Sequence, residues 1–314
     1  MSRFRVLLTD YAWPDLEIER TILAEYDAEL VVAPNRDMAT LIDLARDVDA
    51  IMSNWSDVPA ELIDAAPRCR IIARLGIGLD NIDVDQAVAS GVNVMNTPAA
   101  SSVSVAELAL AMMFALARNL VPATNSMMAG QWEKKAFAGV EIWNKTLGLV
   151  GLGRIARALG ARCHALGMKV VGYDPYVNAA DIKEFPCEAG ALVDVMSKGD
   201  YISMHVPHTD ETHNMIGAEM IALMKPKAYL IDCSRGGVRD DAALATALKE
   251  GRIAGAGLDV FAKEPPESNP FEGMSNVILA PHVGAQTKEG QSRVGYEVVE
   301  ILRDYFKTGA QATQ

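Results

Sequence analysis

Short hydrophobic runs alternate with amphipathic segments along the first third of the chain. The runs predict buried strands, and the segments between them repeat their apolar residues with a helical period. Strands are expected at residues 4–9, 28–33, 50–53, 69–75 and 92–95, and helices at residues 17–26, 38–46, 60–65 and 84–89. This alternation is typical of a parallel sheet with helices on both faces. The pattern ends at Asn96-Thr97-Pro98, where we expect the first domain to close.

The same alternation resumes at Thr146. Strands are expected at residues 146–150, 170–173, 201–206, 228–233, 253–260 and 277–280, and helices at residues 154–166, 191–197, 219–224 and 241–249. The last helix, at residues 287–307, is longer than this second domain needs, so we expect it to return to the first. The pattern predicts an α/β fold with two doubly wound parallel-sheet domains. Their expected bounds are residues 98–286 and residues 1–97 plus 287–314.

A glycine-rich turn follows the strand at residues 146–150. Gly151, Gly153 and Ala156 have the G-x-G-x-x-A spacing in which glycines permit a tight turn and close approach of a pyrophosphate to a helix N-terminus. Asp174 lies 23 residues after Gly151, at the end of the next strand, where a carboxylate accepts hydrogen bonds from ribose hydroxyls and repels a 2′-phosphate. The context favours NAD over NADP. The alternative is an ordinary βαβ turn whose glycines serve packing alone.

A long apolar helix is expected between the two sheets, at residues 103–120, and a second helix at residues 122–131. The most apolar part of the first of these helices, residues 108–117, is too short to cross a bilayer. A helix this apolar on an exposed hinge needs another protein surface that buries its apolar side chains. We expect a second copy of the chain to supply it, which makes the protein a homodimer.

Charge and cysteine usage narrow the partners and the compartment. The net charge is −12 and the chain has no basic block, which argues against binding of nucleic acid or of anionic membranes. The four cysteines form no close-spaced metal or disulfide pattern, as is typical of a reducing compartment. The first residues enter a strand directly, without the hydrophobic region of a signal peptide. We therefore expect a cytoplasmic protein.

The turn at residues 76–83 combines small and acidic residues directly after a strand. Gly76, Ile77 and Gly78 could present backbone N–H groups to a substrate carboxylate, with Arg74 just before them. The turn could equally be a tight connection in which Asp83 caps the next helix. The spacing does not decide between these two interpretations.

Chemically reactive side chains follow three strands of the second sheet. Arg235 follows one strand, Asp259 and Glu264 another, and His282 the last. Ligands of such sheets bind beyond the carboxyl ends of the strands. A histidine there can supply the proton that a ketone needs on reduction, a carboxylate can fix its tautomer, and an arginine suits a 2-oxo acid. Each residue taken alone is more often structural, but together they indicate a hydride-transfer site.

Three histidines lie close together in the sequence, at His205, His208 and His213. They fall on a strand end and a loop, and the His205-x-x-His208 pair has no third ligand of matching pattern. No metal is expected.

The chain resembles the D-isomer-specific 2-hydroxyacid dehydrogenases over nearly its whole length, and among them the phosphoglycerate dehydrogenases most. The resemblance is carried by residues 76–83, 96–107, 146–156, 205–207, 234–238, 258–266 and 281–287. It implies a Rossmann-type cofactor domain and a flavodoxin-like substrate domain, and a dimer built on the helix at residues 103–120.

The resemblance also implies a role for each matching residue. His282 is implied as the general acid/base, Glu264 as its orienting carboxylate, and Arg235 as the group that binds and polarises the 2-oxo acid. The substrate is expected at Asn54, Ile77, Gly78 and Arg235. NAD is expected at Thr97, Gly151, Gly153, Arg154, Ile155, Asp174, His205, Val206, Pro207, Cys233, Ser234, Arg235, Asp259, His282 and Gly284.

Some features depart from the family pattern. Ala156 replaces the usual third glycine, and the loop at residues 53–57 carries Trp55 and Asp57 where phosphoglycerate enzymes tend to carry basic residues. Because an aspartate repels phosphate, hydroxypyruvate or glyoxylate is at least as good a candidate substrate as 3-phosphoglycerate. The alternative function is that of the C-terminal-binding proteins, NAD-sensing corepressors that resemble this family and keep the same three catalytic residues.

Overall fold

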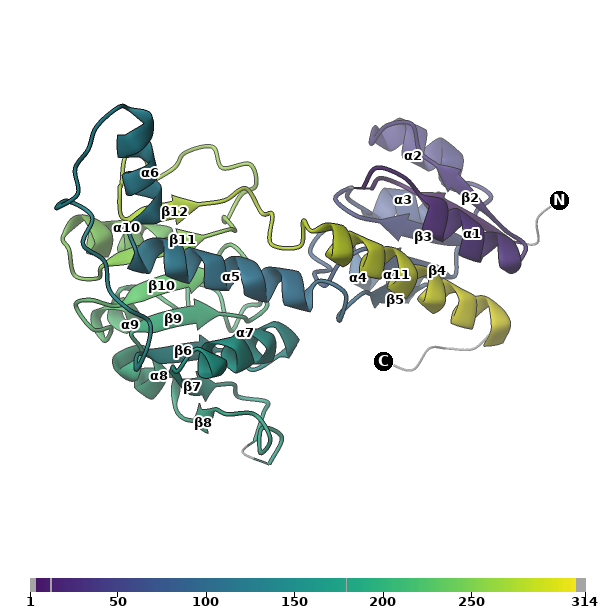
Figure 1. Ribbon diagram of the computed structural model, residues 1–314. Helices are drawn as coiled ribbons and strands as arrows, with labels where there is room; N and C mark the ends of the chain where they lie inside the picture. The colour runs from purple at the N-terminus through teal and green to yellow at the C-terminus, as the bar shows by residue number, and fades with distance from the viewer. Residues whose placement is uncertain (1–3, 12, 179, 309–314) are drawn as a thin grey trace. The chain divides into compact units, whose positions relative to one another are not determined.

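The structure is a computed structural model that describes residues 4–11, 13–178 and 180–308. It forms two compact units (Figure 1). Unit 1 comprises Met1–Ser101 and Gln286–Gln314, and unit 2 comprises Ser102–Ala285. Each unit holds one parallel sheet between helices, which confirms the predicted fold class. The divisions after Ser101 and Ala285 lie close to the expected ones, which were drawn after residues 97 and 286.

Unit 1 contains a five-stranded parallel sheet in the order β2-β1-β3-β4-β5. Its strands are β1 (Phe4–Leu8), β2 (Ala28–Val32), β3 (Ala50–Ser53), β4 (Ile71–Arg74) and β5 (Asn93–Asn96). Its helices are α1 (Glu17–Glu25), α2 (Met38–Ala45), α3 (Ala60–Asp64), α4 (Val84–Ala89) and α11 (Lys288–Thr308). β4 is shorter at both ends than the apolar run at residues 69–75, because Cys69 and Leu75 pack in the core outside the strand ladder.

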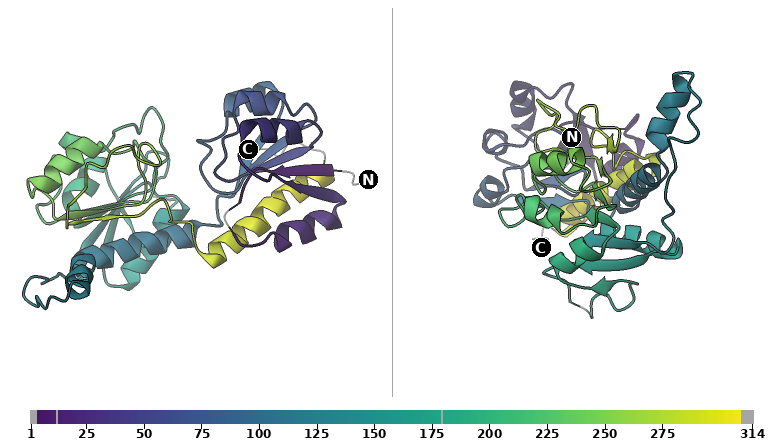
Figure 2. Two further views of the ribbon diagram at one scale, coloured as in Figure 1. Left: turned by 90° about the horizontal axis from the view of Figure 1, so that it is seen from above. Right: turned by 90° about the vertical axis from the view of Figure 1, so that its left-hand side faces the viewer.

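The C-terminal helix completes the core of unit 1, as its length predicted. α11 packs beside α1 and over β4, and the left view of Figure 2 shows it on one face of the sheet. Val298, Val299 and Leu302 are fully buried there, and Phe306 stacks on Phe4 of β1 with ring centroids 4.2 Å apart. Helices α2, α3 and α4 enclose a second apolar cluster on the opposite face.

Unit 2 contains a seven-stranded parallel sheet in the order β12-β11-β10-β9-β6-β7-β8. Its strands are β6 (Thr146–Val150), β7 (Lys169–Tyr173), β8 (Glu188–Ala189), β9 (Tyr201–Met204), β10 (Tyr229–Asp232), β11 (Gly255–Leu258) and β12 (Val277–Leu279). Its helices are α5 (Ser102–Ala117), α6 (Leu120–Met128), α7 (Arg154–Ala165), α8 (Leu192–Lys198), α9 (Ala218–Ala222) and α10 (Asp241–Lys249). No hydrophobic run predicted β8, which has two residues.

The order of strands places a topological switch point in the middle of this sheet. β6 pairs with β7 on one side and with β9 on the other. α5 and α7 enclose one apolar cluster against the sheet, while α8, α9 and α10 enclose another. Such a switch point opens a crevice at the carboxyl ends of the strands, which is where ligands of this fold bind. The residues that follow β6, β9, β10 and β11 are thus placed for function.

The helix expected at residues 103–120 ends earlier than predicted. α5 ends at Ala117, and Asn119 adopts a left-handed backbone with φ of 48° before α6 begins at Leu120. The two helices are bent by 66° at this break. Within the described residues no single helix is long and apolar enough to span a bilayer. Among them, only α5 and α6 taken together reach that length and apolar composition, and the bend lies between them.

Candidate active site

The glycine turn leads from β6 into α7. Gly151 has φ of +91°, and a Cβ there would lie 2.6 Å from the carbonyl oxygen of His205. Only glycine meets both conditions. Gly153 is the N-cap of α7, and a Cβ at this position would meet no atom of the described residues within 4 Å. The space in front of the helix N-terminus is therefore open, and the helix begins without a capping side chain.

Asp174 holds this turn from the end of β7. One carboxylate oxygen accepts from the backbone N–H of Leu152 at 2.9 Å, and the other accepts from the N–H of Tyr176 at 2.9 Å. The hydroxyl of Tyr176 donates to Glu211 at 3.1 Å. The acidic groups beside the turn suit ribose hydroxyls and oppose a 2′-phosphate. The open helix N-terminus and this carboxylate together fit a dinucleotide such as NAD.

His282 and Glu264 form a hydrogen-bonded pair at the ends of β12 and β11. His282 Nδ1 lies 2.5 Å from Glu264 Oε2, and Glu264 Oε1 accepts from the N–H of Phe261 at 2.9 Å. Burial raises the pKa of Glu264, but these two hydrogen bonds and the charges of His282 and Arg235 outweigh it and leave the pKa below its usual range. The carboxylate is therefore ionised at neutral pH and fixes one imidazole nitrogen.

A buried carboxylate supports the turn that carries His282. Asp259 is 1% exposed, and its two oxygens accept from the N–H groups of Val283 and Gly284, each at 2.8 Å. The backbone N–H of His282 donates to the carbonyl of Asp259 at 2.9 Å, and His282 itself has φ of 53°. Burial raises the pKa of Asp259, although the two N–H groups oppose the shift. Asp259 thus orients the histidine through the backbone.

Arg235 lies on the tight loop that follows β10. Its NH1 donates to the carbonyl of Ser234 at 2.7 Å. Gly236 lies so close to Phe261 that a Cβ on it would be 1.8 Å from the Phe261 carbonyl oxygen. The loop is therefore pressed against the segment that leads to Glu264. The charge of Arg235 reaches Glu264, since it contributes to the lowered pKa of that carboxyl.

Further predicted cofactor residues lie at the ends of β9 and β10. His205 contacts Ser203 Oγ through Nε2 at 2.9 Å, while its buried Nδ1 has no hydrogen-bond partner among the described residues. Burial lowers the pKa of His205 to about 3, so the ring is neutral at physiological pH. Cys233 is buried, and burial raises the pKa of its thiol, so it is not a thiolate. Val206 and Pro207 follow His205 on the same loop, and Arg154 and Ile155 lie in the first turn of α7.

Thr97, Asn54, Ile77 and Gly78 belong to unit 1, where all four lie near the carboxyl ends of its strands. Arg74 donates to Asn81 at 3.2 Å and to Asn54 Oδ1 at 3.4 Å, and its NH1 would lie 2.6 Å from a Cβ on Gly76. The guanidinium thus lies between the loop after β3 and the loop after β4.

The loop after β4 is held from both ends. The backbone carbonyl of Ile77 accepts from Asn96 at 2.7 Å, and the N–H of Thr97 donates to Gly76 at 3.1 Å. Asp83 caps α4 by accepting from the N–H of Gln86 at 3.0 Å. The capping role of Asp83 leaves the backbone of Ile77 and Gly78 available to a ligand, so the two interpretations of this turn are compatible.

One residue of unit 1 was missed by the sequence analysis. The carboxylate of Asp10 accepts from three consecutive backbone N–H groups, those of Asn54, Trp55 and Ser56, at 3.1, 2.8 and 3.1 Å. A ring of N–H groups of this kind suits an anion. Here the protein's own carboxylate occupies it. The partners are more than forty positions apart in the chain, so no local motif indicates the contact.

Unit 2 contains a second feature that the sequence analysis missed. Asp232, the last residue of β10, pairs with Arg239, and the two side chains are 0% and 1% exposed. Charged residues are almost never this buried unless they are paired. The described residues hold no group of three or more His, Cys, Asp or Glu side chains that could bind a metal ion, and His208 instead contacts His213 at 3.1 Å.

Comparison with known proteins gives consistent matches. Residues 110–284 match the NAD binding domain of the D-isomer specific 2-hydroxyacid dehydrogenases. The chain is 40% identical to D-3-phosphoglycerate dehydrogenase of Methanocaldococcus jannaschii, over 96% of this chain and 57% of that protein. It is 41% identical to hydroxypyruvate reductase of Thermotoga maritima, over 96% and 98%.

A solved structure extends the likeness to the fold. D-lactate dehydrogenase from Aquifex aeolicus, complexed with NAD and lactic acid, superimposes with a TM-score of 0.84 at 29% identity and covers 96% of this chain and 95% of that one. The chain spans about half the length of the phosphoglycerate dehydrogenases that it resembles here, from 50% to 57%. The match of the cofactor domain and the near-complete overlap with the Thermotoga protein establish the relationship. The chain belongs to the D-isomer specific 2-hydroxyacid dehydrogenases, and its unit 2 is an NAD-binding domain.

Proposed function

We propose that the protein is an NAD-dependent oxidoreductase that interconverts a small 2-oxo acid and its D-2-hydroxy acid. The observation that carries the proposal is the hydrogen bond between His282 and Glu264 on an NAD-binding domain, with the charge of Arg235 acting on the same carboxyl. An acid–base histidine, an orienting carboxylate and an arginine are the groups that carbonyl reduction requires.

The cofactor, when bound, supplies or accepts the hydride at C2 of the substrate. Arg235 binds the 2-oxo acid and polarises its carbonyl, because a guanidinium presents a fork of donors to such a group. His282 gives its Nε2 proton to the oxygen as the alkoxide forms. Glu264 holds Nδ1 and favours the imidazolium through its negative charge. In the reverse direction the same nitrogen removes the hydroxyl proton.

Unit 1 contributes the carboxylate site of the substrate in this proposal, through the backbone N–H groups of Ile77 and Gly78. Its loop after β3 argues for a substrate without phosphate. Asp10 already fills the N–H ring of that loop, and Asp57 is exposed on it. Hydroxypyruvate and glyoxylate fit this electrostatic setting better than 3-phosphohydroxypyruvate.

The proposal is tested by following NADH oxidation with hydroxypyruvate, glyoxylate, pyruvate, phenylpyruvate and 3-phosphohydroxypyruvate. We expect turnover of a non-phosphorylated acid that is lost in His282→Ala. Tight NADH binding without turnover of any acid would refute the enzymatic function and favour a cofactor-sensing binding protein. Preference for the phosphorylated acid would refute the assignment of the loop after β3.

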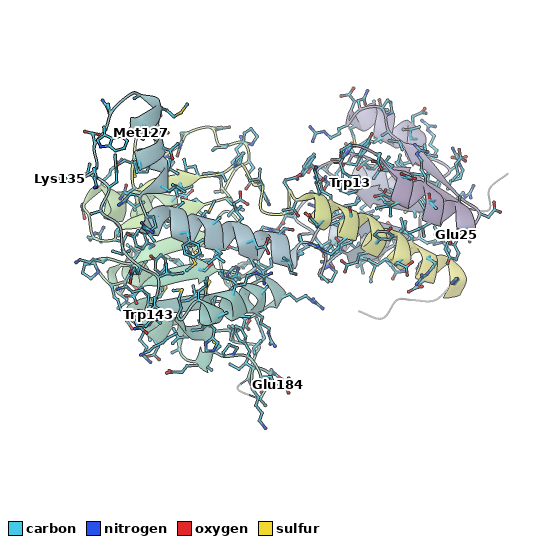
Figure 3. All side chains as sticks on the ribbon, viewed as in Figure 1. Trp13, Glu25, Met127, Lys135, Trp143 and Glu184 are labelled. Atoms are coloured by element: carbon cyan, nitrogen blue, oxygen red, sulfur yellow. The ribbon has the colours of Figure 1, made fainter. Side chains whose placement is uncertain are left out.

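We also infer a homodimer. Exposed apolar side chains lie on α5, on α6 and on the segment that follows, among them Phe114, Met127 and Trp143, of which Figure 3 labels the last two. Met128 is 85% exposed and Trp132 is 80% exposed. Exposed side chains of this size in one region are typical of an interface between subunits. Light scattering at micromolar concentration should give twice the chain mass, and a monomer mass would refute the inference.

We propose a cytoplasmic location for this dimer. Its support is the set of four free cysteines, three of them buried, which suits a reducing compartment. Fractionation of cells that produce the protein tests this location, and recovery in a secreted or membrane fraction would contradict it.

A further inference from the structure

The buried pair of Asp232 and Arg239 spans the loop that carries Arg235. Asp232 lies at the start of this loop and Arg239 at its end. Arg239 NH1 pairs with one oxygen of the Asp232 carboxylate. Its Nε also lies 2.8 Å from Asp241 Oδ1, an ion-pair distance that lacks hydrogen-bond geometry. The loop is therefore closed at its base by an ion pair that water does not reach.

Asp232 connects this pair to Arg235 through hydrogen bonds. The second oxygen of Asp232 accepts from both the backbone N–H and the hydroxyl of Ser234, at 2.9 and 2.6 Å. The carbonyl of Ser234 in turn accepts from Arg235 NH1 at 2.7 Å. Asp232 thus fixes Ser234, the residue whose carbonyl the guanidinium of Arg235 binds.

Arg239 connects the pair to Glu264 and His282. Arg239 NH2 donates to the backbone carbonyl of Val260 at 2.7 Å. The next residue is Phe261, whose N–H holds Glu264 Oε1. Val260 also follows Asp259, the carboxylate that supports the turn of His282. One guanidinium therefore anchors the segment from which both members of the His282–Glu264 pair are held.

We propose that the Asp232–Arg239 pair is the positioning unit of the active site, and that it fixes Arg235 relative to Glu264 and His282. The inference rests on the proposed function, in which these three residues act on one substrate. Replacing a buried ion pair with apolar residues is often neutral or stabilising, so stability alone does not explain this pair. An ion pair with directional hydrogen bonds to two separate loops fixes their relative position in a way that apolar packing does not.

The test uses the Arg239→Met variant in two backgrounds, the natural protein and Arg235→Lys. Misplacing a substrate-binding group by about 1 Å can cost about 100-fold. We therefore expect Arg239→Met to lower kcat/KM for the oxo acid by about that factor, mainly through KM, while the dissociation constant of NADH stays within about 3-fold. In the Arg235→Lys background the same change should cost less than about 5-fold, because two residues that act through each other are not additive.

The outcomes separate the possible failures. An equal loss in both backgrounds, or a parallel weakening of NADH binding, would mean a general structural role and would overturn the inference. Absence of turnover by the natural protein on every oxo acid would instead refute the proposed function. Arg252→Met is the matched control, since Arg252 forms an exposed pair with Glu250 in the same unit and should leave both constants unchanged.

A folding failure would not end the test. If Arg239→Met is not recovered as folded protein, the Asp232→Asn/Arg239→Met double variant, which removes both charges of the Asp232–Arg239 pair, is measured in the same two backgrounds. The same results are expected from it. Full activity of the folded double variant would overturn the inference directly.

Discussion

Two of the pairs that carboxylates form with basic side chains in unit 2 lie in opposite environments. Asp232 and Arg239 are 0% and 1% exposed, whereas Glu264 and His282 are 35% and 47% exposed. Both pairs support the same edge of the sheet, beyond β10, β11 and β12. Only the second pair contains a histidine, the side chain suited to general acid–base catalysis. Arginine keeps its charge throughout, so the buried pair can hold position but cannot transfer a proton.

The difference shows that two pairs at one edge of a sheet serve two tasks, proton transfer and positioning. A proton donor needs access to its substrate and therefore stays partly exposed, at the cost of rigidity. A positioning pair needs low mobility and directional bonds, and these are available where water is excluded. Substitutions at the exposed pair should accordingly lower activity with little change in stability, whereas substitutions at the buried pair should lower both.

The largest expected effect is that of His282→Ala on turnover. Loss of the proton donor should lower kcat by roughly 10³-fold to 10⁴-fold, which is the upper range of general acid–base catalysis. Steady-state NADH oxidation measures this effect. The melting temperature should barely change, because the ring is half exposed. A large drop in melting temperature would mean that the exposed pair is structural as well.

The next effect is that of Arg239→Met on stability. A charge left unpaired in the interior costs roughly 3–5 kcal/mol, so the variant should unfold at a markedly lower urea concentration. The Asp232→Asn/Arg239→Met double variant should recover most of this loss. Chemical denaturation of both variants measures the contrast, and equal stability of single and double variants would contradict it.

A smaller effect is expected for Glu264→Gln. Without the carboxylate, the imidazole loses its fixed tautomer and the support for its charged form, and kcat should fall by about 100-fold. The lowered pKa of Glu264 means that its carboxylate stays ionised as pH falls through the usual range of glutamate. Its support of His282 is therefore lost only at more acidic pH. Profiles of kcat against pH for both proteins measure this, and an unchanged kcat would refute the orienting role.

The smallest effect concerns His205 and appears only in acid. The pKa of His205 is lowered by burial, so below its unfolded value near 6.5 the unfolded chain binds a proton that the folded chain does not. Stability should then fall by roughly 1.4 kcal/mol per pH unit from this group, between pH 6.5 and its folded pKa of about 3. His205→Gln should lack this component. Urea denaturation at pH 7 and pH 5 compares the two proteins, and parallel losses would show that His205 does not titrate as stated.

Periodicity predicted both sheets because parallel strands are short, apolar and evenly separated by helices. The glycine spacing and Asp174 predicted the NAD-binding domain because each of those residues acts within one βαβ unit. Asp10 and Arg239 escaped prediction for the opposite reason. Asp10 is a single acidic residue after a strand and Arg239 a single arginine before a helix, and from sequence alone such residues are expected to be solvated. Only their contacts with distant loops show that they are not. The early end of α5 at Ala117 escaped because apolar residues resume at Leu120, directly after the left-handed Asn119 at which the backbone leaves the helix.

The two kinds of glycine in unit 2 would respond differently in a mutational library. Gly236 faces the Phe261 carbonyl at a distance that no side chain tolerates, so a selection for folded protein alone should return only glycine there. Gly153 faces open space, so alanine at that position should survive the same selection. A selection for NADH turnover should reject alanine at both positions. Comparison of the two selections would then separate glycines kept for the fold from glycines kept for the ligand, without any knowledge of the substrate.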